Sequence, residues 1–254
     1  MKKTSTTLLS AFFLAGIIFW VFFATMPQRI SKEEGSLSEF STQRALKKLA
    51  FIAQEPHYVG SENHKVVADF LMQELENLGL EPTLQEGYSM TDWGNLVKSK
   101  NILARIKGTS NSKALLLLSH YDSAPHSKSL GASDDGSGIV TILEGLRTYL
   151  HNNSKPKNDI IILFSDAEEL GLNGASLFVT EHKWAKEVGL VINFEARGTS
   201  GPSYMLMEVN NGNAAVVEHF AKAKPKFPVS NSLMYSIYKM LPNDTDLTVF
   251  REEG

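Results

Sequence analysis

ALLLLS, residues 114 to 119, is an almost wholly apolar run, and two runs of the same kind follow it: DIIILFS at 159 to 165 and VGLVINF at 188 to 194. Short apolar runs without polar alternation are typical of strands buried on both faces of a sheet. Helical patterns lie between them, near residues 138 to 150 and 174 to 184. This β-α-β-α-β order predicts an α/β fold with a mostly parallel central sheet, right-handed crossovers and helices on both faces.

The segment before the first run predicts two helices and two more strands. Residues 41 to 53 have a helical pattern, and a second helix is expected to begin after the capping residue Ser61 and to end at Gly79. Residues 81 to 90 and 95 to 107 alternate enough between apolar and polar side chains to indicate strands. We expect these elements to form the scaffold of the domain.

The N-terminus carries a candidate membrane anchor. After Lys2 and Lys3, residues 8 to 26 contain no charge, and their number is close to the ~20 that a helix needs to cross a bilayer. An uncleaved single-pass anchor is favoured over a signal peptide, because the stretch is long and residues 24 to 26 are a poor cleavage site. The lysine pair predicts that residues 1 to 7 are cytoplasmic, so the rest of the chain is expected on the non-cytoplasmic side.

The composition and the positions of Pro and Gly indicate the class and the limits of the domain. The 254 residues are 43% hydrophobic, which is enough for a sizeable core. The net charge is −3 without a basic cluster, so we do not expect a nucleic-acid partner. Cysteine is absent, which leaves His, Asp and Glu as ligands for any metal. Residues 27 to 38 are polar and broken by Pro and Gly, which predicts a linker followed by one domain over 39 to 254.

Each of the three apolar runs leads into acids or a histidine. The first run ends at His120, with Asp122 close behind it. The second leads into Glu168 and Glu169, and the third leads into Glu195. Because the carboxyl ends of parallel strands meet at the ligand-binding edge of a sheet, these side chains are expected to converge. Singly they would be ordinary core or surface residues, but together they form an N/O donor set suited to zinc, or to cobalt or manganese.

The loop GASDDGSG, residues 131 to 138, places two like charges in pliable backbone just before a helix. One interpretation is a solvated turn in which Asp134 or Asp135 caps the helix. The other is that a cation compensates the repulsion between the two carboxylates. The other acids expected at the same edge favour the cation.

Four motifs, in their order and spacing, resemble the zinc-dependent metallopeptidase family M28. The motifs are SHYDS (119 to 123), GASDDGSG (131 to 138), DAEELGLNG (166 to 174) and NFEARG (193 to 198), and the match extends to PHYVGSENH (56 to 64) and PNDTD (242 to 246). With its N-terminal apolar segment, the chain is most similar to the branch of vacuolar membrane proteases and endoplasmic reticulum metallopeptidases. The resemblance implies a membrane-anchored aminopeptidase with a peptide substrate.

The resemblance also implies two zinc ions and their ligands. Asp134 would bridge the two ions, and His120 and Glu195 would lie on opposite metals. Glu169 would ligate one of the ions. The family tends to have a cis peptide bond after the bridging acid, which here would join Asp134 to Asp135.

Two further residues receive catalytic roles from the resemblance. Glu168 would be the general base that shuttles a proton while a metal-bridging hydroxide attacks the peptide. Asp122 would accept the second imidazole N–H of His120 and fix its tautomer. Arg197 and Asn243 lie in matched segments and are expected to border the substrate without an assigned chemical role.

The last zinc ligand of the family, a histidine in a later loop, has no match. The chain ends at REEG, residues 251 to 254, so we expect a domain that is incomplete at its C-terminus, binds metal incompletely and has little activity. His57 and His64 lie in the early helical region. The other histidines are expected at the surface: His126, His151, His182 and His219.

Two alternatives from other functional classes stay open. A glutaminyl-cyclase-like acyltransferase shares the fold but uses one zinc and releases ammonia from N-terminal glutamine. A non-catalytic, receptor-like ectodomain also shares the fold, but such relatives usually lose ligands. The donor set of this chain argues against the second alternative, and the missing histidine argues for it.

Overall fold

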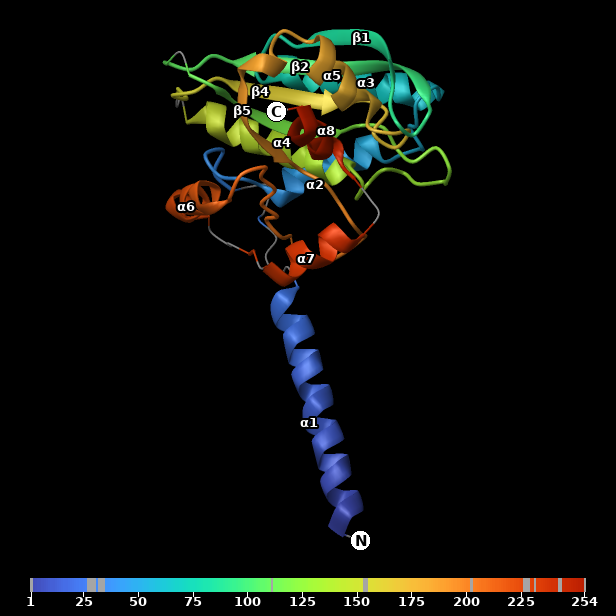
Figure 1. Ribbon diagram of the computed structural model, residues 1–254, viewed down its shortest axis with the longest axis vertical. Coiled ribbons are helices and arrows are strands. Elements are labelled where there is room, and N and C mark those ends of the chain that lie inside the picture. Colours follow the sequence, from blue (N-terminus) through green and yellow to red (C-terminus); the bar gives the residue numbers. More distant parts are fainter. Residues whose placement is uncertain are drawn as a thin grey trace. The chain divides into compact units, whose positions relative to one another are not determined.

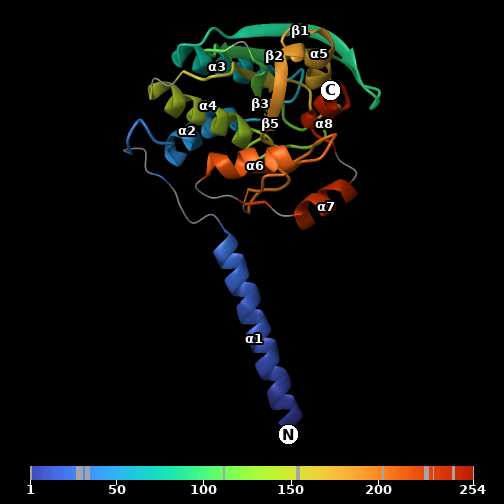
Figure 2. The ribbon, with the colours of Figure 1, turned by 60° about the vertical axis from the view of Figure 1, so that its left-hand side comes forward.

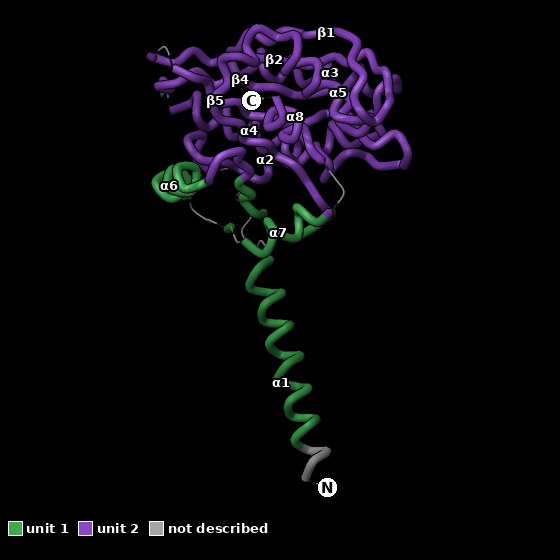
Figure 3. Tube along the Cα trace, in the orientation of Figure 1, with its two compact units in different colours: residues 1–29, 198–207, 213–240 green, residues 30–197, 208–212, 241–254 purple. Residues whose placement is uncertain are grey.

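The computed structural model describes residues 2–26, 31, 35–110, 112–152, 155–201, 203–225, 229–230, 232–241 and 244–253. The chain divides into two compact units (Figure 3). The larger unit comprises residues 30–197, 208–212 and 241–254, and the smaller comprises residues 1–29, 198–207 and 213–240. The sheet and its covering helices belong to the larger unit.

The sheet has five strands in the order β1-β2-β4-β3-β5 (Figure 1). They are β1 (Thr83–Met90), β2 (Leu96–Ile106), β3 (Ala114–His120), β4 (Ile160–Ser165) and β5 (Val188–Asn193). Strand β3 pairs in parallel with both β4 and β5, which confirms the predicted parallel core. The β1–β2 and β2–β4 pairs are antiparallel, so the sheet is mixed. The short β1–β2 connection allows only a hairpin, since parallel neighbours need a long crossover.

Helices cover both faces of this sheet, as the sequence predicts (Figure 2). Successive residues of β4 alternate between the two faces, because side chains of a strand point to opposite sides. Ile162 and Phe164 join the core formed by α2 (Thr42–Ile52), α3 (Glu62–Asn77) and α4 (Gly136–His151). Ile161 and Leu163 join a second core with α5 (Asn173–Glu181), against which Phe250 of α8 (Asp246–Glu253) packs.

The helix boundaries follow the expected capping residues. The Ser61 hydroxyl accepts a hydrogen bond from the backbone N–H of His64 at 3.2 Å, which caps α3. Gly79 has φ +78°, a left-handed conformation that glycine adopts without strain at the end of a helix. The Ser41 hydroxyl caps α2 in the same way, by accepting from the N–H of Arg44.

Strand β5 departs from the expectation that it would be buried on both faces. A 3-10 turn, Ala185–Glu187, leads into it, and β3 is the neighbour with which it pairs. Leu190 is 47% exposed. Apolar composition indicated a buried strand, but burial depends on what packs against each face, and the described residues cover this strand incompletely.

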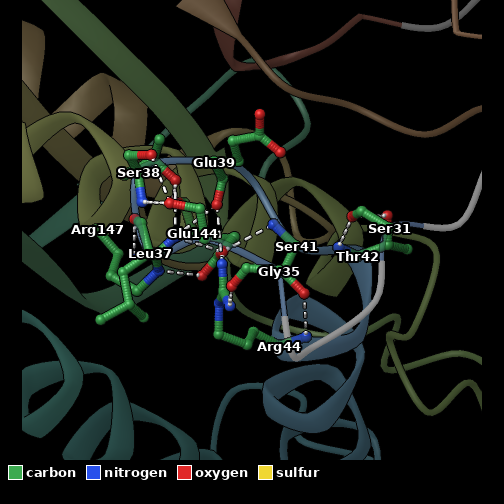
Figure 4. Close-up of polar contacts among 12 residues, drawn as sticks. Ser31, Gly35, Leu37, Ser38, Glu39, Ser41, Thr42, Arg44, Glu144 and Arg147 are labelled. Atoms are coloured by element: carbon green, nitrogen blue, oxygen red, sulfur yellow. Dashed lines mark hydrogen bonds and ion pairs between the residues drawn. The ribbon is translucent and has the colours of Figure 1, made fainter.

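Residues 35 to 41 contact the domain, and 35 to 38 of them lie in the segment expected to be a linker (Figure 4). The Arg147 guanidinium donates to the backbone carbonyls of Leu37 and Glu39, at 2.6 and 2.8 Å. Arg44 also donates to the Glu39 carbonyl, at 2.8 Å. We call residues 35–41 the strap. A guanidinium has five N–H donors, so one arginine can bind several backbone carbonyls. A polar, glycine-containing sequence does not reveal such contacts.

The two arginines that hold the strap converge on one buried acid, Glu144 of α4. Its carboxylate accepts from the Ser41 backbone N–H at 2.9 Å, from Arg44 Nε at 3.0 Å and from Arg147 Nε at 2.8 Å. Burial raises the pKa of Glu144, but these hydrogen bonds outweigh burial and hold the pKa below its usual range. The strap, α2 and α4 therefore share one polar cluster within the larger unit.

The smaller unit contains α1 (Lys2–Thr25), α6 (Ala214–Ala223) and α7 (Ser232–Met240). Within α1, the stretch Thr6–Thr25 has a mean hydropathy of 2.3, and it is long and apolar enough to cross a membrane. Its apolar side chains lie on all sides of the helix and are exposed, unlike the single stripe of a surface helix.

Candidate metal centre

The structure brings the predicted donors together at the carboxyl edge of the parallel strands. His120 is the last residue of β3, Glu195 follows β5, and Asp134 precedes α4. Donor atoms of these three side chains all lie within 4.8 Å of one another. One imidazole nitrogen and two carboxylates at this spacing fit a divalent cation that prefers N/O ligands, such as zinc.

His120 is oriented toward this group by its own strand end. Its Nε2 atom lies 2.9 Å from Asp134 Oδ1 and 3.9 Å from Glu195 Oε1. Its Nδ1 atom lies 3.0 Å from the backbone carbonyl of Asp122 and 3.4 Å from the Asp122 carboxylate. The shorter contact makes the carbonyl the better acceptor for Nδ1–H, which would leave Nε2 available as a ligand. The Asp122 carboxylate was expected in that position.

The Asp122 carboxylate, which lies 3.4 Å from His120 Nδ1, also holds the loop after β4. Its Oδ1 accepts from the backbone N–H of Glu168 at 3.0 Å, and its Oδ2 accepts from the N–H of Glu169 at 3.3 Å. Asp122 is 1% exposed, so these bonds are shielded from water. One side chain at the end of β3 thereby fixes the backbone that carries both glutamates.

Partly buried carboxyl groups crowd this edge. Burial raises the pKa of Glu195 and of Glu169 to about 7, and the Asp134 charge adds to both shifts. Burial also raises the pKa of Glu168 well above its usual range, against the opposing effect of His120. A cation among these groups would favour their ionised forms. This crowding is a second observation that fits a metal.

Asp134 and Asp135 point to different partners, and the capping interpretation holds for Asp135. The Asp135 side chain accepts from the N–H of Gly138 at 3.2 Å and caps α4, and it also accepts from the Ser119 hydroxyl. Asp134 instead faces His120, whose hydrogen bond and charge outweigh burial and lower the Asp134 pKa. The peptide bond between the two acids is cis, as the family resemblance implied.

Asp246 is the last residue of the matched segment PNDTD, and no role was predicted for it from the sequence. Asp246 is the first residue of α8 and is 1% exposed. Its Oδ2 accepts from the Ser165 hydroxyl, and its Oδ1 has no hydrogen-bond partner among the described residues. Burial raises its pKa to about 6. Only the folded chain shows that α8 returns this acid to the end of β4.

Two histidines near the N-terminus lie close to the site without joining the donor group. His57 is 1% exposed, its backbone N–H donates to the Ser123 hydroxyl at 2.9 Å, and burial lowers its pKa. His64 Nε2 lies 2.8 Å from Asp166 Oδ1. His182 is partly buried, in contrast to the surface position expected for it, because its ring stacks on Phe178.

The other expected histidines and substrate residues fall as follows. His126, His151 and His219 are exposed, as predicted. Arg197 donates to the backbone carbonyl of Asp244 at 3.5 Å. Asn243 lies outside the described residues.

Solved structures that are similar in fold include zinc-dependent exopeptidases and glutaminyl cyclases. A Zn-dependent exopeptidase from Parabacteroides distasonis has a TM-score of 0.62 at 22% identity, with 85% of this chain and 81% of that chain covered. Porphyromonas gingivalis glutaminyl cyclase has a TM-score of 0.65 at 21% identity, with 86% and 81% covered. The fold thus defines an α/β class in which both chemistries occur.

The chain belongs to peptidase family M28, whose sequence model matches residues 101–254. It is 32% identical over 269 aligned residues to a vacuolar membrane protease of Candida tropicalis, covering 100% of this chain and 28% of that protein. A vacuolar membrane protease of Schizosaccharomyces japonicus is 31% identical, covering 83% of this chain and 27% of that protein. The chain thus spans less than a third of the length of these relatives.

Proposed function

We propose that this chain is the catalytic region of a zinc metallopeptidase that removes residues from the N-terminus of peptides. The observation that carries the proposal is the group formed by His120, Asp134 and Glu195, whose donor atoms lie within 4.8 Å of one another. Membership of peptidase family M28 supports the same reaction.

His120, Asp134 and Glu195 would hold zinc, together with Glu169 on the loop after β4. Two ions would suit a site with this many carboxylates. When bound, zinc supplies a Lewis acid that polarises a carbonyl and lowers the pKa of water toward ~7. Asp122 contributes by fixing the loop that carries Glu169.

Glu168 is the proposed general base. Its backbone N–H is bonded to Asp122, which sets where its side chain starts. Burial raises its pKa, so its carboxylate is a stronger base than that of a solvated glutamate. Glu168 takes the proton from the attacking water and returns it to the leaving amine, and Asp122 keeps this group in place during both transfers.

The acidic edge supports an aminopeptidase. A free peptide N-terminus is a cation at neutral pH, and excess carboxylate charge near the reacting bond favours it over a blocked terminus. Asp246, which is not among the proposed zinc ligands, provides such charge at this edge of the sheet. Arg197 and Asn243 are proposed to border the rest of the substrate.

The proposed location is a membrane, with α1 as a single-pass anchor and the peptidase domain on the non-cytoplasmic side. The apolar stretch Thr6–Thr25 and the lysine pair before it support this orientation. The relatives named vacuolar membrane proteases support a membrane location.

Zinc content and a matched pair of peptides test the proposal. The full-length protein is purified with zinc, its metal per chain is measured, and a peptide with a free N-terminus is compared with the same peptide N-acetylated. Release of the first residue from the free peptide only is expected. Equal cleavage of both peptides would exclude an aminopeptidase, and a protein that takes up no zinc would exclude the metal site.

The structural likeness to Porphyromonas gingivalis glutaminyl cyclase favours one second candidate, an acyltransferase acting on N-terminal glutamine. A peptide that begins with glutamine separates the two reactions. Release of ammonia with the peptide bond intact would support the cyclase, and release of free glutamine would support the peptidase.

A further inference from the structure

Ala167, between the start of the loop after β4 and Glu168, has an unusual backbone conformation. Its φ is +60°, in the left-handed region, and the residue is 0% exposed. A residue with a Cβ pays a steric penalty there, so such a turn persists only where its surroundings hold it. Because this turn aims the next residue, Glu168, its surroundings control where the proposed base points.

The far end of the turn is held by Asp122. Its two carboxylate oxygens accept from the backbone N–H groups of Glu168 and Glu169. The near end is held through Asp166, which is 1% exposed. The Asp166 backbone N–H donates to Asn101 Oδ1 at 3.1 Å. The strained residue thus lies between two anchored acids.

The Asp166 carboxylate has two partners of its own. Its Oδ2 accepts from the backbone N–H of Lys100 at 2.8 Å, and its Oδ1 lies 2.8 Å from Nε2 of His64. Burial raises the pKa of Asp166, and the hydrogen bond from His64 opposes this shift. His64 therefore supplies one of the bonds that fix the near end of the turn.

His64 also contacts the other strand end that builds the site. Its ring stacks on Tyr121, with 5.0 Å between ring centroids and 17° between planes. Tyr121 stands between His120 and Asp122 in the chain, and its hydroxyl donates to the Lys100 carbonyl at 2.8 Å. The His64 side chain is only 13% exposed. One residue of α3 thus touches both segments that carry the proposed ligands and base.

We propose that His64 is a positioning residue for Glu168, acting through Asp166 to hold Ala167 in its left-handed turn. The proposal rests on the proposed role of Glu168 as the base. His64 is not one of the three residues of the donor group. It restricts the loop to one backbone conformation, from which the Glu168 side chain extends.

A double-mutant cycle with His64→Phe and Ala167→Gly tests this coupling. Phenylalanine keeps a ring against Tyr121 and loses the hydrogen bond to Asp166. Glycine adopts the left-handed turn without a Cβ penalty, so the turn no longer needs His64. We expect H64F to lower kcat about tenfold and to leave KM nearly unchanged. Tenfold is the rate factor that corresponds to the steric penalty of one residue in the left-handed conformation. In the A167G background, H64F should lower kcat by only about twofold.

Two further variants control for effects on folding. His64→Gln keeps an N–H donor for Asp166, so it should retain most of the kcat. His182 stacks on Phe178 with 5.1 Å between centroids and 18° between planes, on the face of the sheet opposite His64. His182→Phe is thus a matched loss of a stacked histidine, and it should leave kcat unchanged.

Hydrogen exchange of the Glu168 and Glu169 amides gives a readout that needs no activity. H64F should speed exchange of these two amides, H182F should not, and the H64F/A167G double variant should be close to the parent. Equal effects of H64F in both backgrounds, on kcat or on exchange, would overturn the proposal. If Glu168→Gln kept full activity while the exchange pattern held, the base assignment would fail, and His64 would remain the residue that positions the loop.

Discussion

At the scale of single residues, two adjacent glutamates after β4 are predicted to behave differently. Glu168→Gln should lower kcat by about 10²- to 10⁴-fold and leave zinc content unchanged, because it removes proton transfer and no ligand. Glu169→Gln is the matched control and should lower zinc content. Metal analysis beside turnover of a peptide with a free N-terminus checks both, and a Glu168→Gln variant within a few-fold of the parent would exclude the assignment.

The two aspartates of the cis peptide bond should also separate. Asp134→Ala is expected to lower zinc occupancy, because Asp134 lies in the donor group. Asp135→Ala should keep more of the zinc. It should lower the free energy of unfolding by about 0.5–2 kcal/mol, because it removes the buried N-cap of α4. Zinc titration and urea unfolding distinguish the two effects. Full zinc loading of Asp134→Ala would contradict the ligand assignment.

The acids at the site predict that the stability of the fold depends on pH and that zinc opposes this dependence. Burial raises the pKa of Glu195 to about 7 and that of Asp246 to about 6. Both values exceed those of the unfolded chain, so these groups make the free energy of unfolding fall as pH rises from about 4 to about 7. Zinc binds the ionised carboxylates, so its stabilising effect should be larger near pH 7 than near pH 5. Thermal unfolding with and without zinc measures this, and a zinc effect independent of pH would contradict it.

At the scale of elements, the strap links α2 to α4 through one buried acid. Glu144→Ala removes the carboxylate that Arg44, Arg147 and the Ser41 N–H share, and leaves two cations without it. We expect a loss of about 3–5 kcal/mol in the free energy of unfolding, together with faster hydrogen exchange in the strap. Urea unfolding and exchange of residues 35–41 are the measurements.

The exposed ion pair between Lys65 and Asp69 on α3 is the control for this prediction. Its side chains are 74% and 65% exposed, so Lys65→Ala should change stability by less than about 0.5 kcal/mol. A Glu144→Ala variant as stable as Lys65→Ala would show that the strap cluster contributes little to the fold.

At the scale of the whole molecule, the lysine pair before α1 predicts the orientation of the chain. In sealed membrane vesicles, protease added on the cytoplasmic side should leave residues after 40 intact, because they lie across the bilayer. The same protease should digest them once detergent opens the vesicles. Digestion in sealed vesicles would reverse both the orientation and the proposed compartment.

Local patterns in the sequence were enough to predict most elements and the residues at the candidate site. Apolar runs indicated β3 and β4, and the polar residues that follow the strands indicated which side chains gather at the carboxyl edge. The cap at Ser61 and the turn at Gly79 followed from the preferences of single residues. Such features depend on neighbours within a few positions, so the sequence alone contains them.

Tertiary structure decided which side chains meet across long stretches of chain. His64 and Asp166 are 102 residues apart, and Ser41 and Glu144 are 103 apart, so no local pattern connects them. The separate partners of Asp134 and Asp135, the attachment of Asp122 to the glutamate loop and the exposure of β5 have the same origin. Each depends on how the loops close and on what packs against each face, and those interactions exist only in the folded chain.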